Sequence, residues 1–171
     1  MSLSRRTLIA TSAIATALLT AGCASVGNVK PGTAYSELIE QYGKPAVICP
    51  TSDGGTRLVW SEGNAGEQAY AVVVDGQQRV SSVTQLMQKP AFDVLGQGQW
   101  DTHDVRCQFG LPAMVRTYGD GKNEMVWQYR FYGPTGAYDM LFVTFDRATG
   151  KMVNFSTGQD PELNISLLGG R

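Results

Sequence analysis

The residues of this chain that could do covalent or metal chemistry are one histidine and three cysteines. His103 and Cys107 are four residues apart, so on a helix they would share one face, as a thiolate–imidazole dyad or a metal-binding pair requires. A metal would need further ligands from elsewhere in the chain, and the Gly-x-Ser-x-Gly turn of many serine hydrolases does not occur. We therefore expect a surface histidine, and we predict no catalytic residues, no metal, no cofactor and no small-molecule substrate.

Cys23 ends a segment that is typical of a secretory signal peptide. Arg5 and Arg6 precede a modestly apolar stretch over residues 8–19, and small residues lead from that stretch to the cysteine. The stretch is too short, and too rich in Ala and Thr, for a helix that spans a bilayer. We therefore predict that residues 1–22 are a signal peptide and that cleavage occurs before Cys23.

The residues up to Cys23 resemble the lipobox of bacterial lipoproteins, with Thr20 where the family usually has Leu. The resemblance implies that Cys23 becomes the first mature residue, carries several acyl chains and anchors the protein to a membrane. Ala24 and Ser25 follow instead of the Asp that retains such proteins at the inner membrane, which implies the periplasmic side of the outer membrane. The alternative is an ordinary cleaved signal with an incidental cysteine. Ser4–Ile9 also resembles a twin-arginine export signal.

Composition limits the size and the partners of the mature protein. Removal of residues 1–22 leaves roughly 150 residues, enough for one compact domain or two small ones. All 15 acidic residues of the 171-residue chain lie after the predicted cleavage site, whereas Arg5 and Arg6, two of its 14 basic residues, lie before it. Because the mature chain is acidic and has no basic stripe, we predict that it does not bind nucleic acid.

Two cysteines, Cys49 and Cys107, follow the predicted lipid-bearing residue. In an oxidising compartment such as the periplasm, an even pair of cysteines can form a disulfide. The alternative is two separately buried thiols, because the sequence does not show whether the two Cα atoms come within about 7 Å of each other. Both alternatives stay open at this point.

One pattern occurs twice in the mature chain, at a constant offset of 67 residues. In each copy a Gly-x-Pro motif is followed by a Val-Trp pair, and apolar residues ahead of the glycine recur at the same offset. The matched pairs are Gly43 and Gly110, Pro45 and Pro112, Val59 and Val126, Trp60 and Trp127, Leu38 and Val105, and Tyr42 and Phe109. Such a series predicts two copies of one supersecondary unit.

Each copy has the pattern of one helix followed by three strands. Tyr35, Leu38, Ile39 and Tyr42 have the spacing of an amphipathic helix, which the glycine and proline of the Gly-x-Pro motif then end. The second copy repeats this pattern over Thr102–Phe109. The predicted strands are Arg57–Ser61, Ala69–Val74 and Arg79–Gln85 in the first copy, and Glu124–Tyr132, Tyr138–Asp146 and Met152–Thr157 in the second.

The fold class predicted from these patterns is α+β, with two tandem units that each combine a helix with a three-stranded antiparallel sheet. A unit of about sixty residues buries little apolar surface alone, so we expect the two copies to pack together. The predicted segments are a lipidated tether at 23–30, the first unit at 31–88, a linker at 89–98, the second unit at 99–158 and a C-terminal tail at 159–171.

Several of these motifs together resemble the BamE (SmpA/OmlA) family of outer-membrane lipoproteins. They are the lipobox, the Gly-x-Pro helix ends, the Val-Trp strands and the Val-Thr-Phe-Asp strand at 143–146. The tandem arrangement is similar to that of β-lactamase-inhibitory protein, which doubles a related unit and binds an enzyme. The first resemblance implies a part in the assembly of β-barrel outer-membrane proteins. The second implies a membrane-tethered inhibitor, or a binding module, for a periplasmic enzyme or the cell wall.

Aromatic and methionine side chains in the second copy predict a protein-binding surface. The strands on both sides of the turn at 133–137 carry apolar residues on their two faces. An aromatic patch is therefore exposed unless the sheet is covered on both sides. We assign Tyr129, Tyr132, Tyr138 and Met140 to a surface that binds an envelope protein. The predicted function is that of a non-enzymatic outer-membrane lipoprotein that scaffolds or modulates an envelope protein complex.

Overall fold

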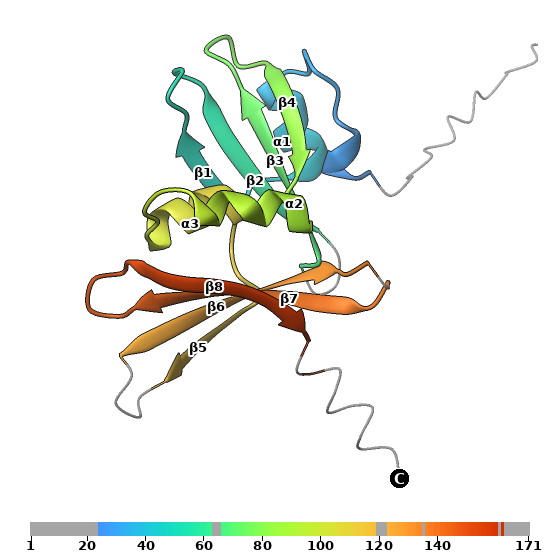
Figure 1. The fold of residues 1–171 in the computed structure, drawn as a ribbon. Coiled ribbons are helices and arrows are strands. Elements are labelled where there is room, and N and C mark those ends of the chain that lie inside the picture. Colours follow the sequence, from blue (N-terminus) through green and yellow to red (C-terminus); the bar gives the residue numbers. More distant parts are fainter. Residues whose placement is uncertain (1–23, 63–65, 119–122, 135, 161, 163–171) are drawn as a thin grey trace, which may run out of the picture.

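The computed structural model describes residues 24–62, 66–118, 123–134, 136–160 and 162. Two four-stranded antiparallel sheets form separate layers, with helices between them and beside the upper sheet (Figure 1). The strands of each sheet follow the order of the chain, β1-β2-β3-β4 and β5-β6-β7-β8, so each sheet is a simple meander. Within the described part of the chain, no helix is long and apolar enough to cross a membrane.

The first unit begins with a short 3-10 helix and an α-helix and continues into four strands. Its elements are η1 (Val26–Asn28), α1 (Tyr35–Tyr42), β1 (Val47–Pro50), β2 (Thr56–Glu62), β3 (Gln68–Val74) and β4 (Val80–Gln85). Leu38 of α1 is buried in a small core with Leu58, Trp60 and Val72 of the first sheet. The apolar stripe seen in the sequence therefore packs on the sheet, as an amphipathic helix does.

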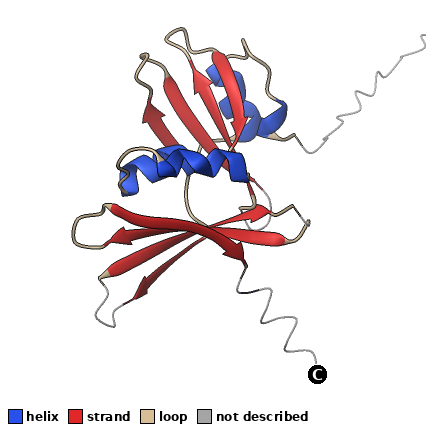
Figure 2. Ribbon diagram, in the orientation of Figure 1, coloured by secondary structure: helices blue, strands red, loops and turns tan. Residues whose placement is uncertain are grey.

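The second unit repeats this order after a helical connection. The connection contains α2 (Lys89–Phe92) and η2 (Asp93–Gly96), and the unit contains α3 (Thr102–Phe109), β5 (Met114–Tyr118), β6 (Glu124–Tyr132), β7 (Tyr138–Asp146) and β8 (Met152–Gln159). Figure 2 shows α2, η2 and α3 in the layer between the two sheets. The glycines that end α1 and α3 both have a positive φ, 73° at Gly43 and 83° at Gly110, which favours glycine at a helix end.

The prediction of a helix and three strands in each unit is wrong, because each sheet has a fourth strand at its start. In β1, Val47 pairs with Val59, and in β5, Met114 pairs with Gln128. Both are edge strands, with only four and five residues, too few for alternation of apolar residues to be recognised. β1 also contains Pro50, a residue typical of sheet edges. The molecule is therefore mostly β-sheet, with few helical residues.

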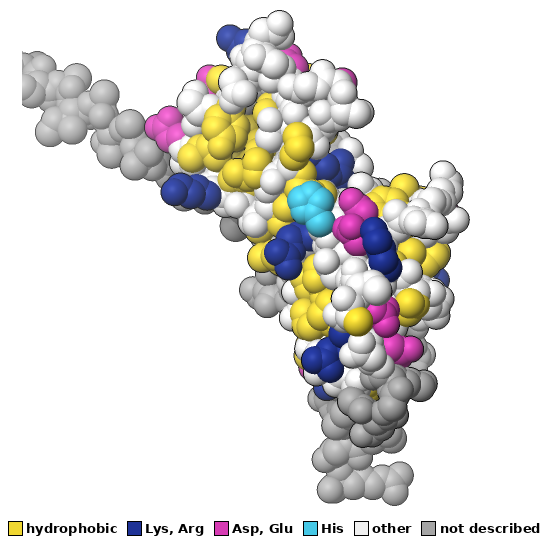
Figure 3. All heavy atoms as spheres, turned by 90° about the vertical axis from the view of Figure 1, so that its left-hand side faces the viewer, with side chains coloured by type: hydrophobic (Ala, Val, Ile, Leu, Met, Phe, Trp, Pro, Cys, Tyr) yellow, Lys and Arg dark blue, Asp and Glu magenta, His cyan; other side chains and the backbone are white. Residues whose placement is uncertain are grey.

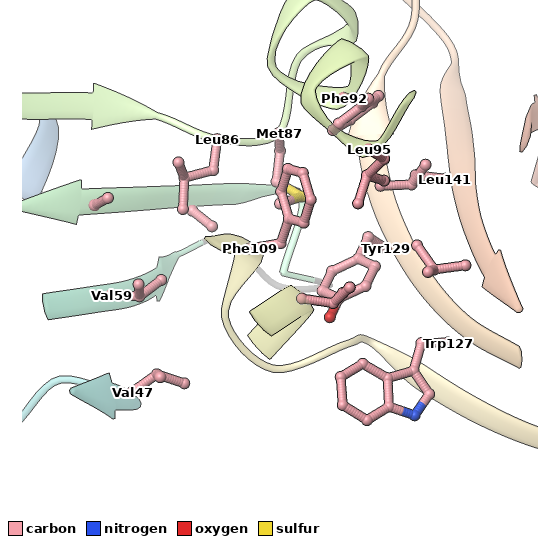
Figure 4. Close-up of a cluster of buried hydrophobic side chains, with 14 of the residues drawn as sticks. Val47, Val59, Leu86, Met87, Phe92, Leu95, Phe109, Trp127, Tyr129 and Leu141 are labelled. Carbon is pink, nitrogen blue, oxygen red and sulfur yellow. The ribbon is translucent and has the colours of Figure 1, made fainter. Parts of the chain in front are cut away.

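The larger of two cores lies between the sheets and contains side chains from both units (Figure 4). Val59 of the first sheet and Leu141 of the second line this core, with Phe109 of α3 between them. The Phe92 ring lies edge-on to the rings of Phe109 and Phe131, with centroid distances of 5.8 and 5.0 Å. Burial of each large apolar side chain contributes about 1.5–3 kcal/mol, so the two units stabilise each other.

The connection at residues 89–98, predicted as a linker, is part of this core. Phe92 of α2 and Leu95 of η2 are buried in it. Pro90 occupies the first turn of α2, where proline costs no hydrogen bond because the first N–H groups of a helix have no partner within it. The sequence does not show this role, since a four-residue helix has no visible period and the nearby glycines are typical of loops.

Residues 24–30, predicted as a tether, are packed against the first unit. Val26 is buried in the smaller core beside Leu38 and Trp60. The Ser25 hydroxyl and the Val26 N–H both donate to the Glu62 carboxylate, at 2.7 Å each. The described part of the predicted tether is therefore fixed. The residue types of this segment alone do not predict that it is packed, because the burial of a single valine depends on the surface that the rest of the fold offers.

The start of the predicted C-terminal tail, at 159–171, is also packed. β8 extends to Gln159, and the carboxylate of Asp160, which is buried, lies 2.6 Å from Nε of Arg130. Glu162 lies 3.0 Å from another nitrogen of the same guanidinium. The chain therefore turns from β8 toward β6 across the face of the second sheet that points away from the first. The remaining residues of the tail lie outside the described part of the chain.

Candidate interaction surfaces and the disulfide

The predicted lipidation site, Cys23, and the signal peptide over residues 1–22 lie outside the described residues. Cleavage before Cys23 and its acylation therefore stay predictions from the sequence. The described chain begins at Ala24, directly after the predicted site, and the packed residues Ser25 and Val26 follow at once. The position of the predicted anchor relative to the fold is thus restricted by covalent geometry.

Cys49 of β1 and Cys107 of α3 are joined by a disulfide, with their Cα atoms 5.8 Å apart. Of the two alternatives left open by the sequence, the structure has the bonded pair. The bond joins the first sheet to the helix of the second unit across a sequence separation of 58 residues. A cross-link over a loop of this length stabilises a folded chain by about 4 kcal/mol in the chain-entropy model.

His103 is exposed and lies one helical turn before Cys107, with its Nε2 atom 3.5 Å from the Sγ atom. The three possible ligand atoms of Cys49, His103 and Cys107 all lie within 4.8 Å of one another. The two sulfur atoms are bonded to each other, however, so neither is a thiolate that could attack a substrate or bind a metal. In this state, the two cysteines join the two units and provide no thiolate.

A cavity of about 380 Å³ lies beside the disulfide, lined by residues of β1, β2, α3 and the segment at 97–100 that precedes α3. Arg57 of β2 lines this cavity and donates to the backbone oxygens of Cys107 and Gln108, at 2.9 and 3.0 Å. These are the carbonyl groups at the C-terminal end of α3, which a cation stabilises. Partial burial lowers the pKa of the Arg57 guanidinium. The polar contacts of this cavity therefore hold the second helix on the first sheet.

Two of the four residues predicted to bind a partner are inside the protein. Tyr129 is buried in the core between the sheets, and its hydroxyl donates to the Gly110 carbonyl oxygen at 3.2 Å. Burial raises the pKa of this hydroxyl well above its usual value. Met140 faces the other side of the sheet, opposite Arg130 and Gly158, and is also fully buried. The assignment of Tyr129 and Met140 to a binding surface is wrong. The sequence shows that these side chains are apolar, but it does not show that other parts of the fold bury them.

The other two predicted residues form a stacked pair at the surface. Tyr132 ends β6 and Tyr138 begins β7, and the two are direct cross-strand partners. Their ring centroids are 4.7 Å apart, and their hydroxyl oxygens are 2.9 Å apart. The hydrogen bond with Tyr132 is the main cause that raises the pKa of Tyr138. Tyr132 is 48% exposed, so the pair presents a rigid aromatic surface to solvent.

A second exposed apolar surface, absent from the sequence prediction, lies between α1 and β1. It is a groove of about 700 Å³, lined by Tyr35, Ser36, Ile39, Glu40, Lys44, Pro45 and Ile48. Ile48 is 58% exposed because Val47 and Cys49, its neighbours in β1, point into the inter-sheet core. In Figure 3 hydrophobic side chains gather on the first unit, above the single histidine. The sequence signal for this groove was the alternation of buried and exposed residues in β1, which places Ile48 on the outer face. This alternation can be recognised only once β1 is known to be a strand.

Comparisons with known proteins do not assign a family. No family model matches the chain, and no curated protein matches it. Among solved structures, the chain is similar to an extracellular protein containing an SCP domain from Bacillus anthracis str. Ames, at 18% identity and with a TM-score of 0.25. The match covers 78% of this chain and 45% of the other, so the chain spans less than half the length of that protein. A likeness this weak supports no conclusion about the fold or the function of this chain.

Proposed function

We propose that this chain is a non-enzymatic lipoprotein, anchored through Cys23 on the periplasmic side of the outer membrane, that binds another envelope protein. The anchor is supported by the signal-peptide pattern and the lipobox-like residues before Cys23. The groove between α1 and β1 is the observation that carries the binding function, because contiguous exposed apolar surface on a folded protein marks interaction sites.

The groove has the composition of a protein contact. Tyr35, Ile39 and Ile48 supply apolar area, while Glu40 and Lys44 place one charge of each sign among its lining residues. An apolar centre with a polar rim is the usual anatomy of such contacts. β1 is the edge strand of the first sheet, so an extended segment of a partner could also pair with its backbone.

The surroundings of His103 support a function without catalysis. The nearest sulfur belongs to the disulfide with Cys49, and the two Arg57 contacts beside it are structural. Nucleophilic catalysis by a cysteine needs a free thiolate next to its base. A specific part in β-barrel assembly follows only from the sequence resemblance and belongs to this proposal as its narrower form.

In-cell photo-crosslinking at position 48 tests the groove. Val153 of β8 is the matched control, because it is 56% exposed while Ile48 is 58% exposed. We expect a photoreactive residue at position 48, but not at position 153, to cross-link one envelope protein. A component of the barrel-assembly machinery would support the narrower proposal, and a single hydrolase or peptidoglycan fragments would indicate the tethered inhibitor or binding module. Equal yields at both positions would contradict the groove.

A further inference from the structure

The first described residues are fixed to one end of the first sheet. The Glu62 carboxylate, at the end of β2, accepts hydrogen bonds from Ser25 and from the Val26 N–H. Gly27 lies so close to the Tyr70 ring that a Cβ atom there would come within 2.6 Å of it. Three residues of fully extended chain span about 11 Å at most, so the residue at position 23 lies within that distance of Val26.

The stacked tyrosines lie at this same end of the molecule. Glu62 pairs with Gln68 where β2 passes into β3. The charge of Glu67, next in sequence to Gln68, acts on Tyr138 and contributes to its raised pKa, after the larger effect of the hydrogen bond with Tyr132. Figure 1 shows η1, the end of β2 and the end of β6 on the right-hand side of the molecule. An anchor at position 23 therefore brings the end of the β6–β7 hairpin toward the membrane.

The chemistry of this end suits a lipid surface. Tyrosine has an apolar ring and a polar hydroxyl, which is why it concentrates at the head-group level of membranes. Arg130 lies beside the pair, with its guanidinium 6.0 Å from the Tyr138 ring, but its charge is matched by the buried Asp160. The Arg130 charge is therefore already paired, and the two tyrosine rings are the groups that we expect to meet the lipid.

We propose that Tyr132 and Tyr138 form the membrane-facing end of the protein and contact the phospholipid head groups. The inference rests on the proposed acyl anchor at Cys23, and it fixes an orientation that the anchor alone leaves open. The groove at β1 then lies at the edge of the first sheet opposite β4, the strand against which η1 packs. The partner is bound away from the bilayer.

The chain contains a matched control for this orientation. Tyr118 is 48% exposed, as Tyr132 is, and both project from the same face of the second sheet. Tyr118 pairs with Glu124, the first residue of β6, whereas Tyr132 is the last residue of that strand. Eight residues at about 3.3 Å each separate the two positions by about 26 Å. One tyrosine is thus at the proposed membrane end and the other at the far end.

The test is photolabelling of the acylated full-length protein in vesicles of phosphatidylethanolamine and phosphatidylglycerol. A small fraction of the phospholipid carries a photoreactive diazirine on its head group, and labelled peptides are quantified by mass spectrometry. We expect at least about fivefold more label on the peptide with Tyr132 and Tyr138 than on the peptide with Tyr118, since about 26 Å separates the two ends. Equal labelling, or more label on Tyr118, would overturn the orientation.

A Cys23→Ser variant separates failure of the orientation from failure of the anchor. If this variant leaves the membrane while the two ends of the acylated protein are labelled equally, the anchor stands and the orientation is wrong. If the variant remains bound to vesicles and keeps the same labelling pattern, the tyrosine end holds the membrane without acylation and the proposed anchor is wrong. Absence of the acylated form from the membrane would overturn both.

Discussion

The two units have the same sheet topology but different surroundings. The first sheet is covered on one face by α1 and on the other by α3, which packs against β1, β2 and β3. The second sheet has α3 on its inner face, and no described helix lies on its outer face (Figure 2). A tandem repeat of this kind thus uses α3 on two sheets, whereas the outer face of the second sheet is crossed by Asp160 and Glu162, which bind Arg130.

Details of the fold recur in both units. A β-bulge interrupts the register between Val73 and Val74 in the first unit and between Thr144 and Phe145 in the second. In each unit, the residue before the α-helix also forms an isolated bridge with a residue that follows the third strand. These bridges are Ala34–Arg79 and Asp101–Lys151. The shared backbone therefore extends to irregular features, and the differences between the units are in side chains.

The two tryptophans show such a difference. The Trp60 indole donates to the Gly43 carbonyl oxygen at 3.2 Å. The indole N–H of Trp127, its counterpart, has no partner among the described residues, and the Gly110 carbonyl oxygen accepts from Tyr129 instead. The helix end is satisfied in both units, but by different side chains.

The largest effect is expected where α3 contacts both sheets. Phe109→Ala should lower the free energy of unfolding by about 3–5 kcal/mol, because a large ring is removed from the shared core. The matched change is Tyr42→Ala in α1, where the ring is half-buried against one sheet, and a loss of about 1–2 kcal/mol is expected. Urea unfolding of the two variants measures the difference. Equal losses would show that α3 does not serve both sheets.

The tryptophans provide an intermediate effect. Trp60→Phe removes a donor from the Gly43 carbonyl, so it should destabilise the fold by about 1 kcal/mol more than Trp127→Phe, which removes an N–H without a described partner. Both changes lose a similar ring area. The comparison is made by thermal and urea unfolding, and a larger loss at Trp127 would show that its indole N–H is hydrogen-bonded in solution.

The smallest expected effect concerns the helix starts. The Asp101 side chain accepts from the N–H groups of His103 and Asp104 and caps α3, whereas Ala34 at the start of α1 has no side-chain cap. Asp101→Ala should destabilise the protein, and Ala34→Asp should stabilise it, each by about 1 kcal/mol at pH 7.

The pH dependence of the Asp101 cap has a definite sign. The hydrogen bond from the Asp104 N–H is the largest cause that lowers the pKa of the Asp101 carboxyl. A carboxylate with a lowered pKa stabilises the fold above its unfolded value, near 3.9, and this contribution is lost as the pH falls through the folded value. Urea unfolding of the wild type and of Asp101→Ala should therefore differ at pH 7, and the difference should shrink as the pH falls through the lowered pKa of the Asp101 carboxyl in the folded protein. A difference that persists in acid would contradict the cap.

Much of the fold could be predicted from local patterns. The 3.6-residue period predicts α1, and the alternation of apolar residues predicts six strands, each within three residues of its observed ends. Local signals therefore locate an element well when it is long enough to show a period.

The features that were missed depend on tertiary contacts. β1 and β5 are short edge strands, and Val26 and Met140 are buried by segments distant in sequence. The exposed tyrosine pair could be found from the sequence because both residues flank a turn in a hairpin. The groove at Ile48 could not, since it exists only when α1 leaves the first edge of the sheet uncovered.

The connection made by α2 and η2 has a consequence for how this protein can be divided. Phe92 and Leu95 pack in the core that both sheets share. If the chain is divided between the two units, each fragment therefore exposes apolar surface that is buried in the whole protein. A single unit expressed alone is therefore a poor substitute for the whole chain, although the sequence repeat suggests that the chain could be divided there. The two similar units therefore share one hydrophobic core, and they belong together in one expressed chain.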